Sequence, residues 1–267
     1  MRAIATFKRV STDISDIQER ITTGQRINSG KDDPGGLIIR EGLRADIKNI
    51  HATQANMTQA EILMDTAASG IMQLLEILRG TDPNDPTNGG LLGELYGSLD
   101  YADKKTVAQD FMKLYDAVVD STKYNNEALL KGVTKTYQLG GGQTLAVGIG
   151  TLSTGDNAAA AALQAAIGDI ADDTTVAAAI TAAETLLGGI AQVSGTLGGS
   201  QKIVAQNQKL LDSRLTSVAA AEGRISNADI AIESSRMARA ELLAQNAMNS
   251  IMYTRSYAAF SVMSLFG

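Results

Sequence analysis

Apolar residues recur at steps of three and four over the first 21 positions of the chain, with polar residues between them. Such a narrow apolar stripe predicts a helix that packs against another helix. Residues 28–36 are rich in Asn, Ser, Gly, Asp and Pro, and they predict a loop after this helix. The members of the stripe are Ile4, Phe7, Val10, Ile14, Ile17 and Ile21.

The longest pattern in the chain runs from Leu43 to Leu78 at alternating steps of four and three. At 1.5 Å per residue, a helix over this stretch extends roughly 50 Å, and it requires a partner helix along its length. The positions between its two ends are Ile47, Ile50, Gln54, Met57, Glu61, Met64, Ala68, Ile71 and Leu75.

Gln54 and Glu61 are the two polar members of this series. An unpaired carboxylate is costly in a packed seam, so both side chains need polar partners. We expect these partners on a returning helix between 201 and 225, or on a neighbouring subunit. Candidates on that helix are Lys202, Gln206, Lys209 and Arg214.

The middle of the chain predicts shorter elements. A loop is expected over 80–90, a helix over about 100–130 and a β-hairpin over 137–147, where Gly140 and Gly142 mark the turn. Residues 151–200 are rich in Ala, Gly, Thr and Ser and predict weak helical pieces near 158–171 and 175–188. The core candidates of the 100–130 helix are Val107, Phe111, Leu114, Tyr115, Val118, Leu129 and Leu130.

The helical pattern returns at Ile203 and continues to the C-terminus, with a break at 226–227. Both termini are therefore predicted to be amphipathic helices that pair with each other. The predicted fold is mainly α: a long antiparallel, coiled-coil-like helical rod with a small β-hairpin region. We expect one domain of paired terminal helices from 1–36 and 228–267. The second, over 37–227, holds the long helices, the hairpin and a short Ala/Gly-rich middle at 133–200.

Composition excludes most catalytic and nucleic-acid-binding classes. Hydrophobic residues make up 44% and charged residues 19% of the 267 positions, which argues against disorder. The net charge of −6 argues against nucleic-acid binding. The chain has no Cys and the single histidine His51, so we expect no metal site and no His- or Cys-based catalysis.

Two stretches resemble functional motifs only superficially. Gly24 and Gly30–Lys31 are separated by five residues instead of the four of a phosphate-binding loop, and Asp32 follows where Ser or Thr is needed. The pairs Asp32–Asp33 and Asp172–Asp173 lack calcium-loop spacing. We therefore predict a protein that is not an enzyme and has no cofactor.

Charged residues interrupt every apolar stretch of residues 1–21, and eighteen consecutive apolar residues occur nowhere. We accordingly expect no cleaved secretory signal and no membrane span. Apolar seams at both termini, without an active-site candidate, favour self-association. The residues expected to form these contacts are those of the N-terminal stripe and Leu242, Leu243, Met248, Ile251, Met252, Phe260, Met263, Leu265 and Phe266.

Several segments resemble bacterial flagellin. ERITTGQRINSGKDD at 19–33 is similar to the family's N-terminal ERLSSGxRINSAKDD, and YNNEALLKG at 124–132 is similar to FNGxxLLxG. RISNAD at 224–229, followed by MARAELL at 237–243, resembles RIxDAD…MSRAxIL, and the terminal VMSLFG resembles VLSLLx. The residues that carry the match are Arg26, Asn28, Ser29, Lys31, Asp32, Asp33, Arg224 and Asp229.

This resemblance covers about residues 10–132 and 200–267 and implies a subunit of the flagellar filament. Its terminal helices would form an inner tube, and the chain would leave the cell through the flagellar export channel without a cleaved signal. The implied partners are further copies of the chain, the export apparatus, an export chaperone, and cap and junction proteins. Two alternatives stay open: the related hook–filament junction protein, and a non-enzymatic helical adaptor or chaperone.

Overall fold

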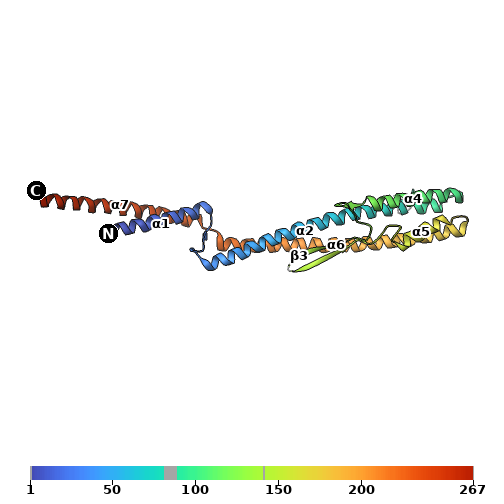
Figure 1. Cartoon of the computed structure of the whole chain (residues 1–267), viewed down its shortest axis with the longest axis horizontal. Coiled ribbons are helices and arrows are strands. Elements are labelled where there is room, and N and C mark those ends of the chain that lie inside the picture. The colour runs from blue at the N-terminus through green and yellow to red at the C-terminus, as the bar shows by residue number, and fades with distance from the viewer. Residues whose placement is uncertain (1, 81–88, 141, 267) are drawn as a thin grey trace. The chain divides into compact units, whose positions relative to one another are not determined.

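The structure is a computed structural model that describes the backbone of residues 2–80, 89–140 and 142–266, and the side chains of these ranges between 4 and 254 (Figure 1). The described part contains seven helices and four short strands, which confirms the mainly α class. In chain order they are α1 (Arg2–Thr23), α2 (Pro34–Arg79), α3 (Leu91–Tyr96), α4 (Tyr101–Ser121), β1 (Lys123–Tyr124), β2 (Glu127–Ala128), β3 (Thr134–Gly140), β4 (Gln143–Gly148), α5 (Ala158–Gly168), α6 (Asp173–Ser226) and α7 (Ile230–Phe266).

The chain folds into two compact units. One contains Met1–Lys48 and Ser213–Gly267, and the other contains Asn49–Asp212. Of the boundaries predicted, 227/228 falls in the break between α6 and α7, whereas 36/37 lies inside the first turn of α2, which begins at Pro34. The functional division at those boundaries stays a prediction.

In the first unit, α1 and α7 pack against each other over most of the length of α1. Val10, Ile17 and Ala240 form the buried core of this pair, because the three- and four-residue steps place them on facing stripes. Partly buried apolar residues flank this core: Ile14, Ile21, Met237 and Ala244.

In the second unit, α2 and α6 lie side by side (Figure 1). The members of the predicted seam of α2 in this unit are alternately buried and half-buried, apart from Glu61. Positions seven apart, such as Met57, Met64 and Ile71, are buried, whereas Glu61 is exposed. Gly70 also comes close to Thr122 and Leu130, so α2 packs on more than one neighbour and needs a wider apolar face than a coiled-coil seam. The additional buried positions are Ala60, Leu63, Ala67 and Leu74.

Gln54 and Glu61 meet polar residues of the returning helix, as predicted. Gln54 Nε2 donates to Asp212 Oδ1 at 2.7 Å, and Gln208 Nε2 donates to Glu61 Oε2 at 3.1 Å. The partners are therefore Gln208 and Asp212, which lie one turn apart on one face of α6. The four candidates proposed for this role were wrong: Lys202, Gln206, Lys209 and Arg214.

The helix predicted over 100–130 ends earlier, at Ser121. Asn125 and Asn126 both adopt positive φ, at 49° and 65°, and form the tight turn of the β1–β2 hairpin. Asparagine tolerates this conformation, which no helix can contain. Of the predicted core residues, Tyr115, Val118, Leu129 and Leu130 are buried, Val107 and Phe111 are half-buried, and Leu114 is 51% exposed.

The predicted hairpin over 137–147 is confirmed as the antiparallel β3–β4 pair, in which Tyr137 faces Leu145. Gly140 and Gly142 have φ of +88° and +80°, so both occupy the left-handed region that favours glycine. β4 buries Val147, and the ladder irregularity falls next to the turn, between Gln138 and Gly140.

The weak helical pieces predicted near 158–171 and 175–188 correspond to α5 and to the start of α6. The interruption expected between the piece near 175–188 and the pattern that returns at Ile203 is absent, because α6 is continuous over 54 residues. Leu186, Ile190 and Leu197 of α6 are buried, and this packing offsets the low helix propensity of the glycines among them. By length and composition α6 also meets the criterion for a membrane span, which core helices of water-soluble proteins meet as well.

Candidate assembly surface and the motif junction

The two segments that carry the family motifs lie about 200 residues apart in sequence and pair with each other in the first unit. Gln25 and Asn227 form an antiparallel bridge. The backbone amide of Arg26 donates to the Ser226 carbonyl at 2.6 Å. The guanidinium Nη2 of Arg26 donates to the Ile225 carbonyl at 3.1 Å. This motif junction joins the loop after α1 to the break between α6 and α7.

The acidic pair Asp32–Asp33 organises the loop that leads into α2. Asp32 Oδ2 accepts hydrogen bonds from the amides of Asn28 and Ser29 and from the Ser29 hydroxyl, at 2.9–3.1 Å. The backbone bond from Ser29 is the main reason that the pKa of Asp32 lies below its usual range. Asp33 Oδ1 accepts from the Gly36 amide at 2.9 Å and so caps the first turn of α2.

Arg40 is the residue at the junction that the sequence analysis missed. It is 6% exposed, and its Nη1 donates to the Ile27 carbonyl and, at 3.3 Å, to Gln25 Oε1. Nη2 also contacts Glu41 Oε1 at 2.8 Å. An arginine in the second turn of a helix carries no local signal of burial, because its partners come from the folded loop.

The start of α7 holds a second set of polar contacts. Asp229 Oδ1 accepts from the amides of Ala231 and Ile232 at 3.0 and 3.2 Å and caps the helix. Glu233 is 4% exposed and faces α1, where its Oε2 lies 3.9 Å from Arg20 Nε. Of the other motif residues, Lys31 lies 3.7 Å from Asp16, and Arg224 is exposed.

A buried and an exposed group stand out among the residues predicted for self-assembly. Val10 and Ile17 are buried in the α1–α7 pair, whereas Ile4, at 52%, is exposed. Phe7, Ile14, Ile21 and Ile251 are half-buried. The exposed group continues on α7 with Leu242 (61%), Leu243 (49%), Met248 (47%) and Met252 (64%), while the side chains of Phe260, Met263, Leu265 and Phe266 lie outside the described residues.

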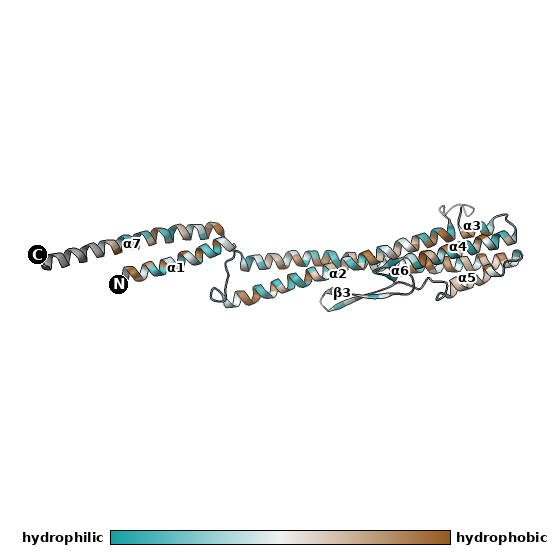
Figure 2. Cartoon of the chain, turned by 45° about the horizontal axis from the view of Figure 1, so that its top comes forward, coloured by the Kyte–Doolittle hydropathy of each residue, from teal (hydrophilic) through white to brown (hydrophobic). Residues whose placement is uncertain are grey.

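The apolar surface of these helices is therefore larger than one α1–α7 pair covers. Figure 2 shows hydrophobic and hydrophilic residues alternating along both helices where they are coloured. On α7 the residues facing α1 include Met237, Ala240 and Ala244, and the larger leucines point elsewhere.

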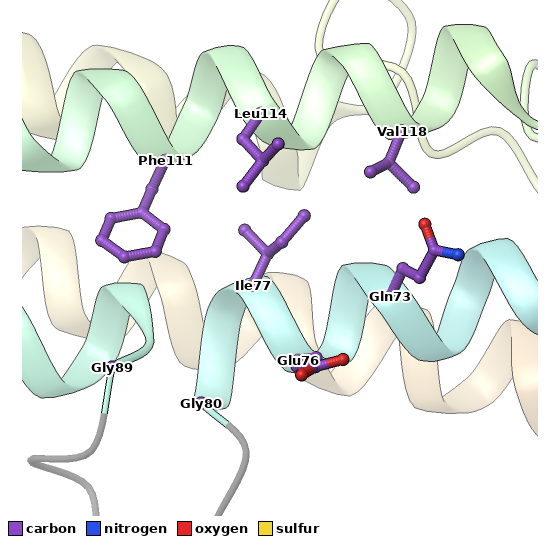
Figure 3. A pocket seen from close by; sticks show the side chains of 8 residues that line it. All are labelled: Gln73, Glu76, Ile77, Gly80, Gly89, Phe111, Leu114 and Val118. Carbon is purple, nitrogen blue, oxygen red and sulfur yellow. The ribbon is translucent and has the colours of Figure 1, made fainter.

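The second unit has a groove between the C-terminal end of α2 and helix α4 (Figure 3). Its volume is about 390 Å³, and the side chains of Ile77, Phe111 and Leu114 line it together. Glu76 is the one ionisable residue among the described residues that line it, so the lining supplies no acid–base pair.

The fold and these surfaces define a class of protein: a mainly helical structural subunit whose terminal helices pair and carry further apolar surface. Comparison with known families is more specific. The bacterial flagellin N-terminal helical region matches residues 1–135, and the bacterial flagellin C-terminal helical region matches residues 180–256. The chain belongs to the bacterial flagellin family, and its function is that of a structural subunit of the flagellar filament.

Individual relatives agree over most of the chain. It is 27% identical to a flagellin of Halalkalibacterium halodurans, over 85% of this chain and 82% of the relative. A flagellin of Brucella melitensis is 23% identical, over 100% of this chain and 96% of the relative. A solved structure described as a putative flagellar hook-associated protein from Vibrio parahaemolyticus has the same fold, with a TM-score of 0.51 at 14% identity, over 73% of this chain and all of that one.

Proposed function

We propose that this chain assembles into a helical homopolymer through the residues of α1 and α7 that the α1–α7 pair leaves exposed. The observation that carries the proposal is the exposure of large apolar side chains on α7, Leu242 and Met252 above all. Each such side chain contributes about 1.5–3 kcal/mol when it moves from water into a packed contact.

The two groups of apolar residues have different roles in this proposal. The buried group, with Val10, Ile17 and Ala240, closes the α1–α7 pair within one chain. The exposed group packs against neighbouring copies, and the motif junction connects the two terminal helices to the start of α2 and the end of α6. The functional boundaries at 36/37 and 227/228 are part of this proposal.

Flagellins of this family form the extracellular flagellar filament. Export without a cleaved signal, through the flagellar apparatus and with an export chaperone, is part of the proposal, as are contacts with cap and junction proteins. Flagellins are structural proteins, and we propose that this chain catalyses no reaction.

Electron microscopy of the purified chain after seeding or salt-induced assembly tests the proposal. Long uniform filaments are expected. A chain that stays monomeric and binds another flagellar protein would support a helical adaptor instead. Short caps on hook ends without extended filaments would favour the hook–filament junction protein, and substrate turnover would contradict the structural role.

A further inference from the structure

The first turns of α7 carry a basic surface row. Arg236 and Arg239 lie three residues apart and line a groove of about 390 Å³ together with Ala231, Ile232 and Ser235. Arg236 is tied to Glu233 by a bond of 2.7 Å from Nη1 to Oε1. Arg239 is exposed and forms no ion pair with any side chain that the structure describes. Ile232, which is 50% exposed, contributes an apolar side chain to the lining of this groove.

The outer surface of α1 carries an acidic row with the same step. Asp13, Asp16 and Glu19 follow one another at three-residue intervals. Asp16 lies 3.7 Å from Lys31, whereas Asp13 and Glu19 are exposed and have no ion-pair partner within the described side chains. Residues at three-residue steps form one of the ridges by which helices pack into the grooves of others.

We propose that the acidic row of one copy docks on the basic row of a second copy and fixes the register of their terminal helices. This inference rests on the proposed function and adds the pair of surfaces that meet. It follows from charge complementarity: both rows share the i, i+3 step, and each keeps at least one charge unpaired within the described part of its own chain.

A second copy is the occupant that the chemistry favours. The rows lie on the same two helices whose remaining apolar residues, such as Leu242 and Leu243, need a partner. Hydrophobic contacts hold two helices together but do not fix their register. Complementary charges favour one relative orientation of the helices and disfavour orientations in which like charges meet. The charged rows therefore act as the specificity element of an apolar contact.

Charge reversal on the full-length chain tests this inference through the critical concentration for seeded polymerisation. Arg239→Glu is expected to raise it about tenfold, because like charges then face each other. Asp13→Lys with Glu19→Lys is expected to do the same. The triple variant with both reversals should return to within about twofold of the unaltered chain. Arg236 is left intact because it holds Glu233.

Matched controls carry equal charge changes at exposed sites elsewhere: Lys209→Glu for the basic reversal, and Asp46→Lys with Glu184→Lys for the acidic one. They should assemble like the unaltered chain. Circular dichroism establishes that each variant is folded, and Arg239→Gln gives a neutral variant with a smaller expected effect.

Two results would overturn the charged contact. One is normal assembly of Arg239→Glu, and the other is a folded triple variant that assembles as poorly as either one-sided variant. Neither result would contradict filament formation by the unaltered chain. A triple variant restored only by addition of another protein would identify a different partner and would equally overturn it. Failure of the unaltered chain to polymerise would instead contradict the proposed function itself.

Discussion

Among the residues that the structure describes, amide–carboxylate hydrogen bonds join α2 to α6 at three places in the second unit. Besides the pairs of Gln54 and Glu61, Gln201 Nε2 donates to Asp65 Oδ1 at 2.9 Å. A neutral amide meets a carboxylate in each of them, so no basic residue is needed to satisfy the acid. These bonds are exposed to solvent, and their value lies in selecting one register of the helix pair.

Replacing Gln54 and Glu61 with Leu tests this role at the level of single residues. Because both bonds are exposed, we expect the free energy of unfolding to change by less than about 1 kcal/mol. Register selection is lost, and filaments should become irregular. Thermal unfolding and cryo-electron microscopy measure the two effects. A double variant whose filament geometry is unchanged would show that these positions are ordinary surface residues.

The Asp32 loop gives a pH-dependent prediction. Three donors stabilise the ionised carboxylate, so its pKa is lowered in the folded chain. The resulting stabilisation is complete above the ordinary aspartate pKa of about 4 and is lost as pH falls through the lowered value. The amide resonance of Ser29 should therefore titrate below pH 4. In Asp32→Asn that titration should vanish, and a midpoint at the ordinary value in the unaltered chain would contradict the prediction.

At the scale of elements, glycines distinguish the surroundings of α2 from those of α6. A Cβ at Gly70 of α2 would lie 2.4 Å from Thr122 Oγ1 and 3.1 Å from Leu130 Cδ1, so this glycine permits close packing against the β1–β2 region. A Cβ at Gly198 of α6 would meet no atom within 4 Å. The same residue type is thus required in one helix and unfavourable in the other.

Alanine at these two glycines should have opposite effects. Gly70→Ala is expected to lower the free energy of unfolding by about 1–3 kcal/mol through overpacking. Gly198→Ala should raise it by about 0.5–1 kcal/mol, because alanine restricts the unfolded chain and favours helix. Denaturant unfolding of the two variants side by side measures the difference. Equal shifts of the same sign would mean that α2 does not pack closely at Gly70.

At the scale of the whole molecule, the two units have separate buried cores. The second unit has large buried side chains of its own, among them Met64, Leu74 and Tyr115, and needs no residue of α1 or α7 to bury them. The first unit depends on the pairing of α1 with α7, whose core is small. Loss of a terminal helix should therefore affect assembly much more than the fold of the second unit.

Deleting residues 1–18 or 250–267 tests this separation. Either deletion should abolish polymerisation, because it removes apolar residues expected to contact neighbouring copies. The thermal transition of the second unit should persist, since its helices keep their buried contacts. Sedimentation and calorimetry report the two properties. Filaments of normal length from a truncated chain would exclude the removed helix segment from the contacts.

Periodicity and turn residues act locally, so the sequence alone predicts most of the helical stretches, the β3–β4 hairpin and the apolar stripes of the terminal helices. It did not predict that α4 ends at Ser121 or that α6 is continuous from Asp173. The sequence could not determine which face of α2 is buried, since that depends on how α6 and the β1–β2 region both pack against it. It could not determine the partners of Gln54 and Glu61 either. The burial of Arg40 likewise depends on Ile27 and Gln25 in the folded loop. Only tertiary structure joins Arg26 to Ser226, because contacts between segments 200 residues apart depend on the path of the whole chain.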